Sequence, residues 1–168
     1  MTEQQAPVRT LPAGRYVVDP AGSTVAFTTR HMFGLGGVRG TFTVTGGEIT
    51  VSGDHVEATG TVDAASIDTG NSSRDRQVRS KTYLDAGTHP QITLRAAGDL
   101  PGPVPGELTA RGGSAPVSVV VVEATEADGV LTARLTTSVD RYAHGITAMK
   151  GITGRRLELE ITARAVRV

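Results

Sequence analysis

Apolar and polar residues alternate along most of this chain. Val25 and Phe27 lie on one face of the segment 24–30. Thr24 and Thr28 lie on the other face. The same alternation recurs in the segments 42–45, 48–52, 55–63, 91–95, 131–139 and 157–163. A period of two is that of a β-strand with one covered face, so the pattern predicts an all-β protein.

Turn-forming residues separate the alternating segments at short intervals. They are Gly46-Gly47, Ser52-Gly53-Asp54, Pro101-Gly102-Pro103 and Asp128-Gly129. We expect about eight or nine strands, and many short strands joined by hairpin turns form a sandwich or a closed barrel. One apolar face per strand favours a single antiparallel sheet curled around that face. A barrel of about eight strands holds one small ligand or is filled by its own side chains.

The stretch 66–90 is the one part of the chain that lacks strand periodicity. Ser72 and Asp75 have the spacing of a capping box, and Asn71 is an alternative helix cap. The spacing of Thr82 and Asp85 repeats this signal, and the glycine two residues later is suited to close a turn in the left-handed conformation. Two short helices are therefore expected, as an insert near residues 71–87.

Composition excludes several classes of protein. Seventeen basic and seventeen acidic residues give a net charge of zero, whereas nucleic-acid binders usually carry a basic excess. Cysteine is absent, which excludes disulfides and thiolate chemistry. The polar segment 1–12 is expected to be a loose tail without a leader, and residues 13–168 one domain. No stretch is long and apolar enough for a transmembrane segment, so we expect a cytoplasmic protein.

Small residues among the predicted inward positions leave two interpretations open. Ala58, Gly60 and Ala133 point inward, and only three phenylalanines occur in the chain. Such a lining either leaves a cavity or fits a tight core. An enzyme using a cavity would need a titrating group inside it, and Asp140 and His144 are the candidates. No two histidines have metal-ligand spacing, so neither a metal nor a cofactor is expected.

Several separated motifs follow one another along the chain. The first are Tyr16-x-x-Asp19, then Ser23-x-x-x-Phe27-x-x-Arg30-His31, and then Val38-Arg39-Gly40-x-Phe42. The most specific motif is Ala65-Ser66-Ile67-Asp68-Thr69-Gly70-Asn71-x-x-Arg74-Asp75. Later motifs are Leu84-Asp85, His89-Pro90, Gly106-x-Leu108-Thr109-x-Arg111-Gly112 and Val139-Asp140-Arg141-x-x-x-Gly145. Together they resemble the YceI-like family of polyisoprenoid-binding proteins, and the resemblance extends over about residues 14–168.

The resemblance implies an eight-stranded, lipocalin-like antiparallel barrel with its helical insert after about the fourth strand. It also implies that an isoprenoid lipid, either a polyprenyl phosphate or an isoprenoid quinone, lies in an apolar pore. Gln77, Tyr83 and Arg111 depart from the family pattern, in which His, Phe and His are usual. These departures bear on the head-group chemistry more than on the fold.

We therefore expect a non-enzymatic carrier or sequestering protein for an amphiphilic isoprenoid lipid. The alternatives are an acid–base isomerase or hydrolase using the same cavity, and a filled barrel that binds partners through a strand edge. Transient membrane contact and a homodimer are left open. The expected pore residues are Val25, Phe27, Phe42, Val44, Ile49, Ala58, Val62, Ile92 and Leu94. The expected residues at the mouth are Arg30, His31, Arg74 and Asp75.

Overall fold

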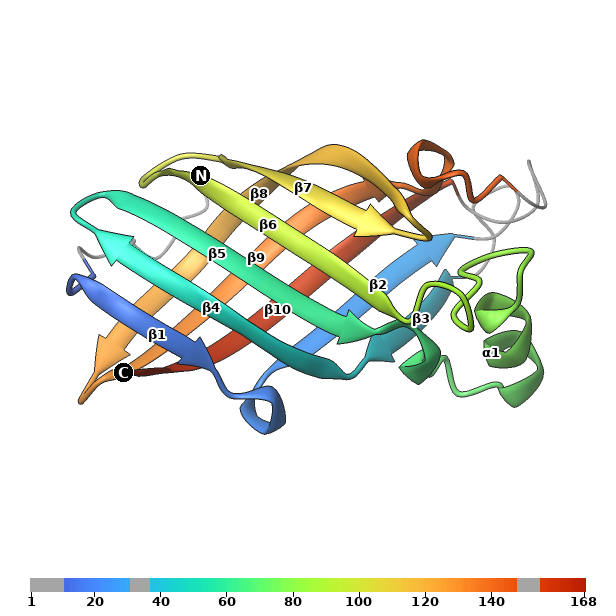
Figure 1. Ribbon diagram of the computed structural model, residues 1–168, viewed down its shortest axis with the longest axis horizontal. Coiled ribbons are helices and arrows are strands. Elements are labelled where there is room, and N and C mark those ends of the chain that lie inside the picture. Colours follow the sequence, from blue (N-terminus) through green and yellow to red (C-terminus); the bar gives the residue numbers. More distant parts are fainter. Residues whose placement is uncertain (1–10, 31–36, 148–154) are drawn as a thin grey trace.

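Ten strands make up most of the described structure (Figure 1). The computed structural model describes residues 11–30, 37–147 and 155–168. All strand pairings are antiparallel. The strands are β1 (Gly14–Val18), β2 (Thr24–Arg30), β3 (Gly37–Phe42), β4 (Val44–Ser52), β5 (His55–Asp63), β6 (Gln91–Asp99), β7 (Val104–Ala110), β8 (Gly113–Ala127), β9 (Val130–Asp140) and β10 (Arg156–Arg167).

These ten strands occupy eight positions around a closed barrel. β1 and β2 are two halves of one bent strand, and so are β3 and β4, since β2 pairs with β3 while β1 pairs with β4. The sheet closes at β10, which pairs with β9 along one side. Its other side pairs with β2 near Ile161 and with β1 near Val166. The prediction of an all-β, eight-stranded antiparallel barrel is confirmed.

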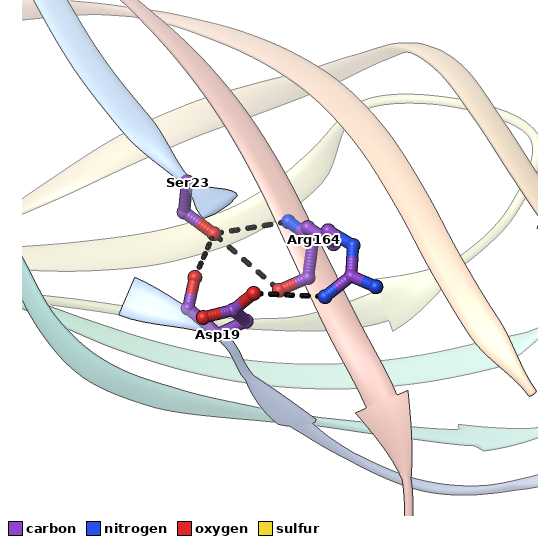
Figure 2. A network of polar contacts seen from close by, with 3 residues as sticks. All are labelled: Asp19, Ser23 and Arg164. Carbon is purple, nitrogen blue, oxygen red and sulfur yellow. Dashed lines mark hydrogen bonds and ion pairs between the residues drawn. The ribbon is translucent and has the colours of Figure 1, made fainter. Parts of the chain in front are cut away.

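A small polar network fixes the bend between β1 and β2 (Figure 2). The hydroxyl of Ser23 donates to the carbonyl oxygen of Asp19 at 2.8 Å and accepts from the backbone N–H of Arg164 at 3.0 Å. The guanidinium of Arg164 also reaches the Asp19 carboxylate at 2.8 Å. Because Arg164 lies on β10, these bonds tie the bend to the strand that closes the barrel.

One end of the barrel interior is filled by large side chains. Tyr16 is fully buried, Leu131 is 1% exposed, and both pack with Ala165 and Val51. Leu11 joins this cluster, and the carbonyl oxygen of the next residue accepts a bond from the Tyr16 hydroxyl at 2.9 Å. We call this packed cluster the floor. It closes the barrel end opposite α1 (Ser72–Arg79).

The insert contains one helix rather than the two expected. Asn71 caps α1 by accepting a bond from the backbone N–H of Arg74, so the alternative cap is correct and the Ser72 capping box is wrong. The segment 80–88 forms hydrogen-bonded turns, in which Asp85 rather than Gly87 has a positive φ of 48°. Among the residues that the structure describes, no helix is long and apolar enough to cross a membrane.

The pair Gly46-Gly47 does not turn the chain, which corrects another expectation. β4 runs through both glycines, with a register shift between Val44 and Gly46 where it pairs with β5. At Gly47 an added Cβ would come within 2.5 Å of the Thr59 carbonyl oxygen. The glycine therefore permits close approach of two strands at a bulge, which sequence alone does not distinguish from a turn.

The Ser23 network gives a stability prediction. We expect Ser23→Ala to lower the free energy of unfolding by about 1–3 kcal/mol, because it removes the acceptor of the partly buried Arg164 N–H. Chemical denaturation measures this change. Ser52→Ala at an exposed position is the control and should stay within about 0.5 kcal/mol of the unmodified protein. Equal effects of the two substitutions would contradict a locking role for Ser23.

Candidate functional site

The barrel interior holds a cavity of about 190 Å³, measured for the centre of a water-sized sphere. That is more than ten times the roughly 10–15 Å³ that a single water needs on this measure. The lining is almost wholly apolar and comes from strands all around the barrel. Of the three small residues expected to point inward, Ala58 and Gly60 lie in this lining and leave space, whereas Ala133 packs in the core cluster with Leu131. Ala163 also lies in the lining.

Eight of the nine residues expected in the pore line this cavity. They are Val25, Phe42, Val44, Ile49, Ala58, Val62, Ile92 and Leu94. The pleat phase inferred from the two-residue alternation is therefore correct for these strands, because a slip of one residue would turn each side chain outward. Their role in binding a ligand stays a prediction.

Phe27 is the exception and does not line the cavity. It is 5% exposed and packs with Val38 and Ile67 in a separate cluster. Its ring also lies 5.6 Å from that of Phe42, centre to centre, and covers Gly40, where an added Cβ would come within 2.5 Å. Phe27 thus fills the interior beyond the cavity. Alternation gives the direction of a side chain but not its depth along the barrel.

Of the four expected mouth residues, the structure describes the side chains of Arg74 and Asp75. Arg30 ends β2, where its backbone pairs with Gly37; its side chain, like the whole of His31, lies outside the described residues. Arg74 and Asp75 both bind Thr69. A head-group role for these residues stays a prediction.

Thr69 links the start of α1 to the preceding loop. Its backbone N–H and its hydroxyl both donate to one oxygen of the buried Asp75 carboxylate, at 2.9 and 2.6 Å. The same hydroxyl accepts from Nε of Arg74 at 2.9 Å, and an Arg74 NH2 group donates to the Thr69 carbonyl oxygen. These bonds hold the insert together, and they engage one oxygen of Asp75 and two nitrogens of Arg74.

The insert contributes to the lining of the cavity at its α1 end. Leu84 is 8% exposed and Ile146 is 7% exposed, and both line the cavity while packing against Tyr83 and Ala86. Leu84 is held by the hydrogen bond from its N–H to the Val78 carbonyl oxygen at the end of α1. The cavity therefore lies between this part of the insert and the floor.

Two ionisable side chains line the cavity at this α1 end. Arg141 and His144 are each 4% exposed and come from the 3₁₀ turn Arg141–His144 that follows β9. In a 3₁₀ helix, residues three apart lie on the same face. Arg141 donates to the carbonyl oxygen of Ile146 at 2.8 Å. Nδ1 of His144 lies 2.8 Å from the carbonyl oxygen of Gly113. Sequence reasoning found His144 but missed Arg141.

The motif Val139-Asp140-Arg141-x-x-x-Gly145 was the signal that could have pointed to Arg141. Asp140 caps the turn by accepting from the N–H of Tyr142 at 3.0 Å, and Gly145 ends it with a φ of 74°. A hydrogen bond from Arg155 holds the pKa of Asp140 below its usual range. Asp140 does not line the cavity, and no carboxylate of the described residues does. Its carboxylate thus orients the turn.

Comparison with known families gives a match over most of the chain. The model of the YceI-like domain matches residues 16–165, which include all the cavity-lining strands. The chain belongs to the YceI-like domain family. A UPF0312 protein of Vibrio parahaemolyticus is 26% identical over 117 residues, and a second one, of Vibrio vulnificus, is 27% identical. Each match covers 64% of this chain and spans 61% of the length of the curated relative.

Solved structures show the same YceI-like barrel. BcnA of Burkholderia cenocepacia superposes with a TM-score of 0.78 at 23% identity, covering 89% of this chain and 99% of that one. A polyisoprenoid binding domain from Saccharophagus degradans superposes with a TM-score of 0.71 at 13% identity, covering 94% of this chain and 100% of that one. At these identities the likeness shows the fold.

The buried carboxylate of the insert gives a second prediction. We expect Asp75→Ala to destabilise the protein by about 1–3 kcal/mol, because the Thr69 N–H loses its acceptor. Hydrogen exchange of residues 66–88 should accelerate more than that of the barrel strands. Asp54→Ala, at an exposed turn, is the matched control and should change neither quantity. Unchanged exchange in the insert would show that Asp75 does not hold it.

Proposed function

We propose that this YceI-like domain binds an amphiphilic isoprenoid lipid inside its barrel, for transport, storage or sequestration. The observation that carries the proposal is the apolar cavity inside the barrel, with Arg141 and His144 in its lining. Membership of the YceI-like family supports it, as does the likeness to a structure named as a polyisoprenoid binding domain. A polyprenyl phosphate and an isoprenoid quinone both fit this chemical class.

The energetics of such a site depend on its apolar lining. Each buried CH₂ group contributes roughly 0.8 kcal/mol, so a few isoprene units bind without polar contacts. The cavity volume of about 190 Å³ is smaller than the roughly 300–1,000 Å³ of pockets that enclose drug-sized ligands. We therefore propose that the cavity holds a short isoprenoid, or one section of a longer tail.

The distribution of polar groups favours one orientation of the lipid. The tail points toward the floor formed by Tyr16 and Leu131, where the side chains are apolar or internally bonded. The head group lies at the α1 end, beside Arg141 and His144. In this proposal Leu84 and the rest of the insert move for the lipid to enter, and transient membrane contact at that end would serve delivery.

An enzyme using the same cavity remains the alternative, because His144 is an imidazole in its lining. Acid–base catalysis usually uses a second titrating group, and the described carboxylates lie outside the cavity. The two functions differ in a simple readout. A carrier returns a bound prenyl lipid chemically unchanged after incubation, whereas an isomerase or hydrolase converts it.

Gly60 offers a direct test of the cavity. It lies on β5 among the cavity-lining residues, and a Cβ added there meets no atom within 4 Å. We expect Gly60→Leu to fold normally and to weaken binding of farnesol, a short isoprenoid alcohol, by about tenfold or more. The added side chain takes the place of several lipid carbons. Isothermal titration calorimetry measures the binding, and thermal unfolding the stability.

The control is Ser52→Leu, at an exposed position outside both the cavity and the insert. It introduces a leucine away from the proposed site and should leave farnesol binding as it is. Undiminished binding by a folded Gly60→Leu protein would place the lipid elsewhere and contradict the proposal.

A further inference from the structure

His144 combines deep burial with a fixed orientation. The residue is 4% exposed and lines the cavity. Its Nδ1 lies 2.8 Å from the carbonyl oxygen of Gly113, at the start of β8. Two other hydrogen bonds anchor the turn that carries His144. Arg111 donates to the Gly145 carbonyl oxygen at 3.1 Å, and the Ile146 N–H donates to the Arg141 carbonyl oxygen.

The bond to Gly113 determines which ring nitrogen carries the proton. A carbonyl oxygen only accepts hydrogen bonds, so Nδ1 of His144 must be the donor. In the neutral ring the other nitrogen, Nε2, then carries a lone pair and acts as an acceptor. No described residue donates a hydrogen bond to Nε2.

The α1 end of the cavity therefore offers two kinds of polar group. Arg141 is a donor only, because a guanidinium has no acceptor atom. His144 adds an acceptor on the same face of the turn. Head groups made only of carbonyl or ether oxygens cannot donate a hydrogen bond to Nε2 of His144. A hydroxyl can, since it donates as well as accepts.

We propose that Nε2 of His144 accepts a hydrogen bond from a hydroxyl on the head group, and that the protein thereby selects isoprenoids ending in a hydroxyl over those with capped oxygens. This inference rests on the proposed function and narrows its ligand class. It assigns His144 a role in specificity, and it requires no chemical conversion of the lipid. An alcohol, a hydroquinone or a protonated phosphate has the required group.

The test compares farnesol with its methyl ether, which retains the oxygen acceptor and loses the donor. All titrations are carried out in the same buffer and at the same pH. The unmodified protein should bind farnesol about tenfold or more tightly than the ether, because the ether leaves a buried acceptor unpaired. A site that hydrogen-bonds a hydroxyl discriminates strongly against analogues that lack it.

Two variants distinguish loss of the hydrogen bond from the steric effect of the methyl group of the ether. His144→Asn keeps an N–H for Gly113 and lacks an acceptor at the position of Nε2, so the preference should fall to about twofold or less. His144→Gln places an amide oxygen near that position and should restore most of the preference. Thermal unfolding checks that both variants are folded.

Each outcome decides the proposal. Equal affinity of the unmodified protein for farnesol and its ether overturns the role of His144 while leaving lipid binding in place. A wild-type preference retained in folded His144→Asn also overturns it. If neither compound binds, the proposed function fails and this inference with it. Should His144→Asn not fold, the ratios measured for the unmodified protein and His144→Gln still decide.

Discussion

Closure of the sheet through β10 is the constraint on which the rest of the structure depends. One strand must pair with β9 along its whole length and with two differently directed half-strands, β1 and β2, on its other side. The bend between those halves is possible because Ser23 and Asp19 bond to Arg164 on β10. Without closure the sheet would enclose no interior, and its apolar face would have to pack against another layer of structure.

Given a closed barrel, the size of the inward residues decides whether it is hollow. Tyr16 and Leu131 fill one end, while Ala58, Gly60 and Ala163 leave space further along. The insert then contributes Leu84 at the other end, and the turn Arg141–His144 adds polar groups there. An amphiphilic lipid requires an apolar cavity with one polar end. The geometry of the barrel interior therefore agrees with the proposed function.

The sequence predicts most of the barrel because alternation is a local signal with a period set by the backbone. It placed Val25, Ile49 and Leu94 on the inner wall correctly. It failed where long-range contacts decide the outcome. Phe27 points inward but lies beyond the cavity. The turn sequence that brings Arg141 to the cavity carries no recognisable periodicity.

The central claim is that the barrel is a container for isoprenoid lipid. The most direct measurement is native mass spectrometry of the intact protein purified from cells, followed by extraction and identification of any bound lipid. Our account predicts an added mass of one prenyl lipid per chain, and a higher melting temperature when such a lipid is supplied. A protein that carries no lipid, and whose melting temperature no prenyl compound raises, would contradict it.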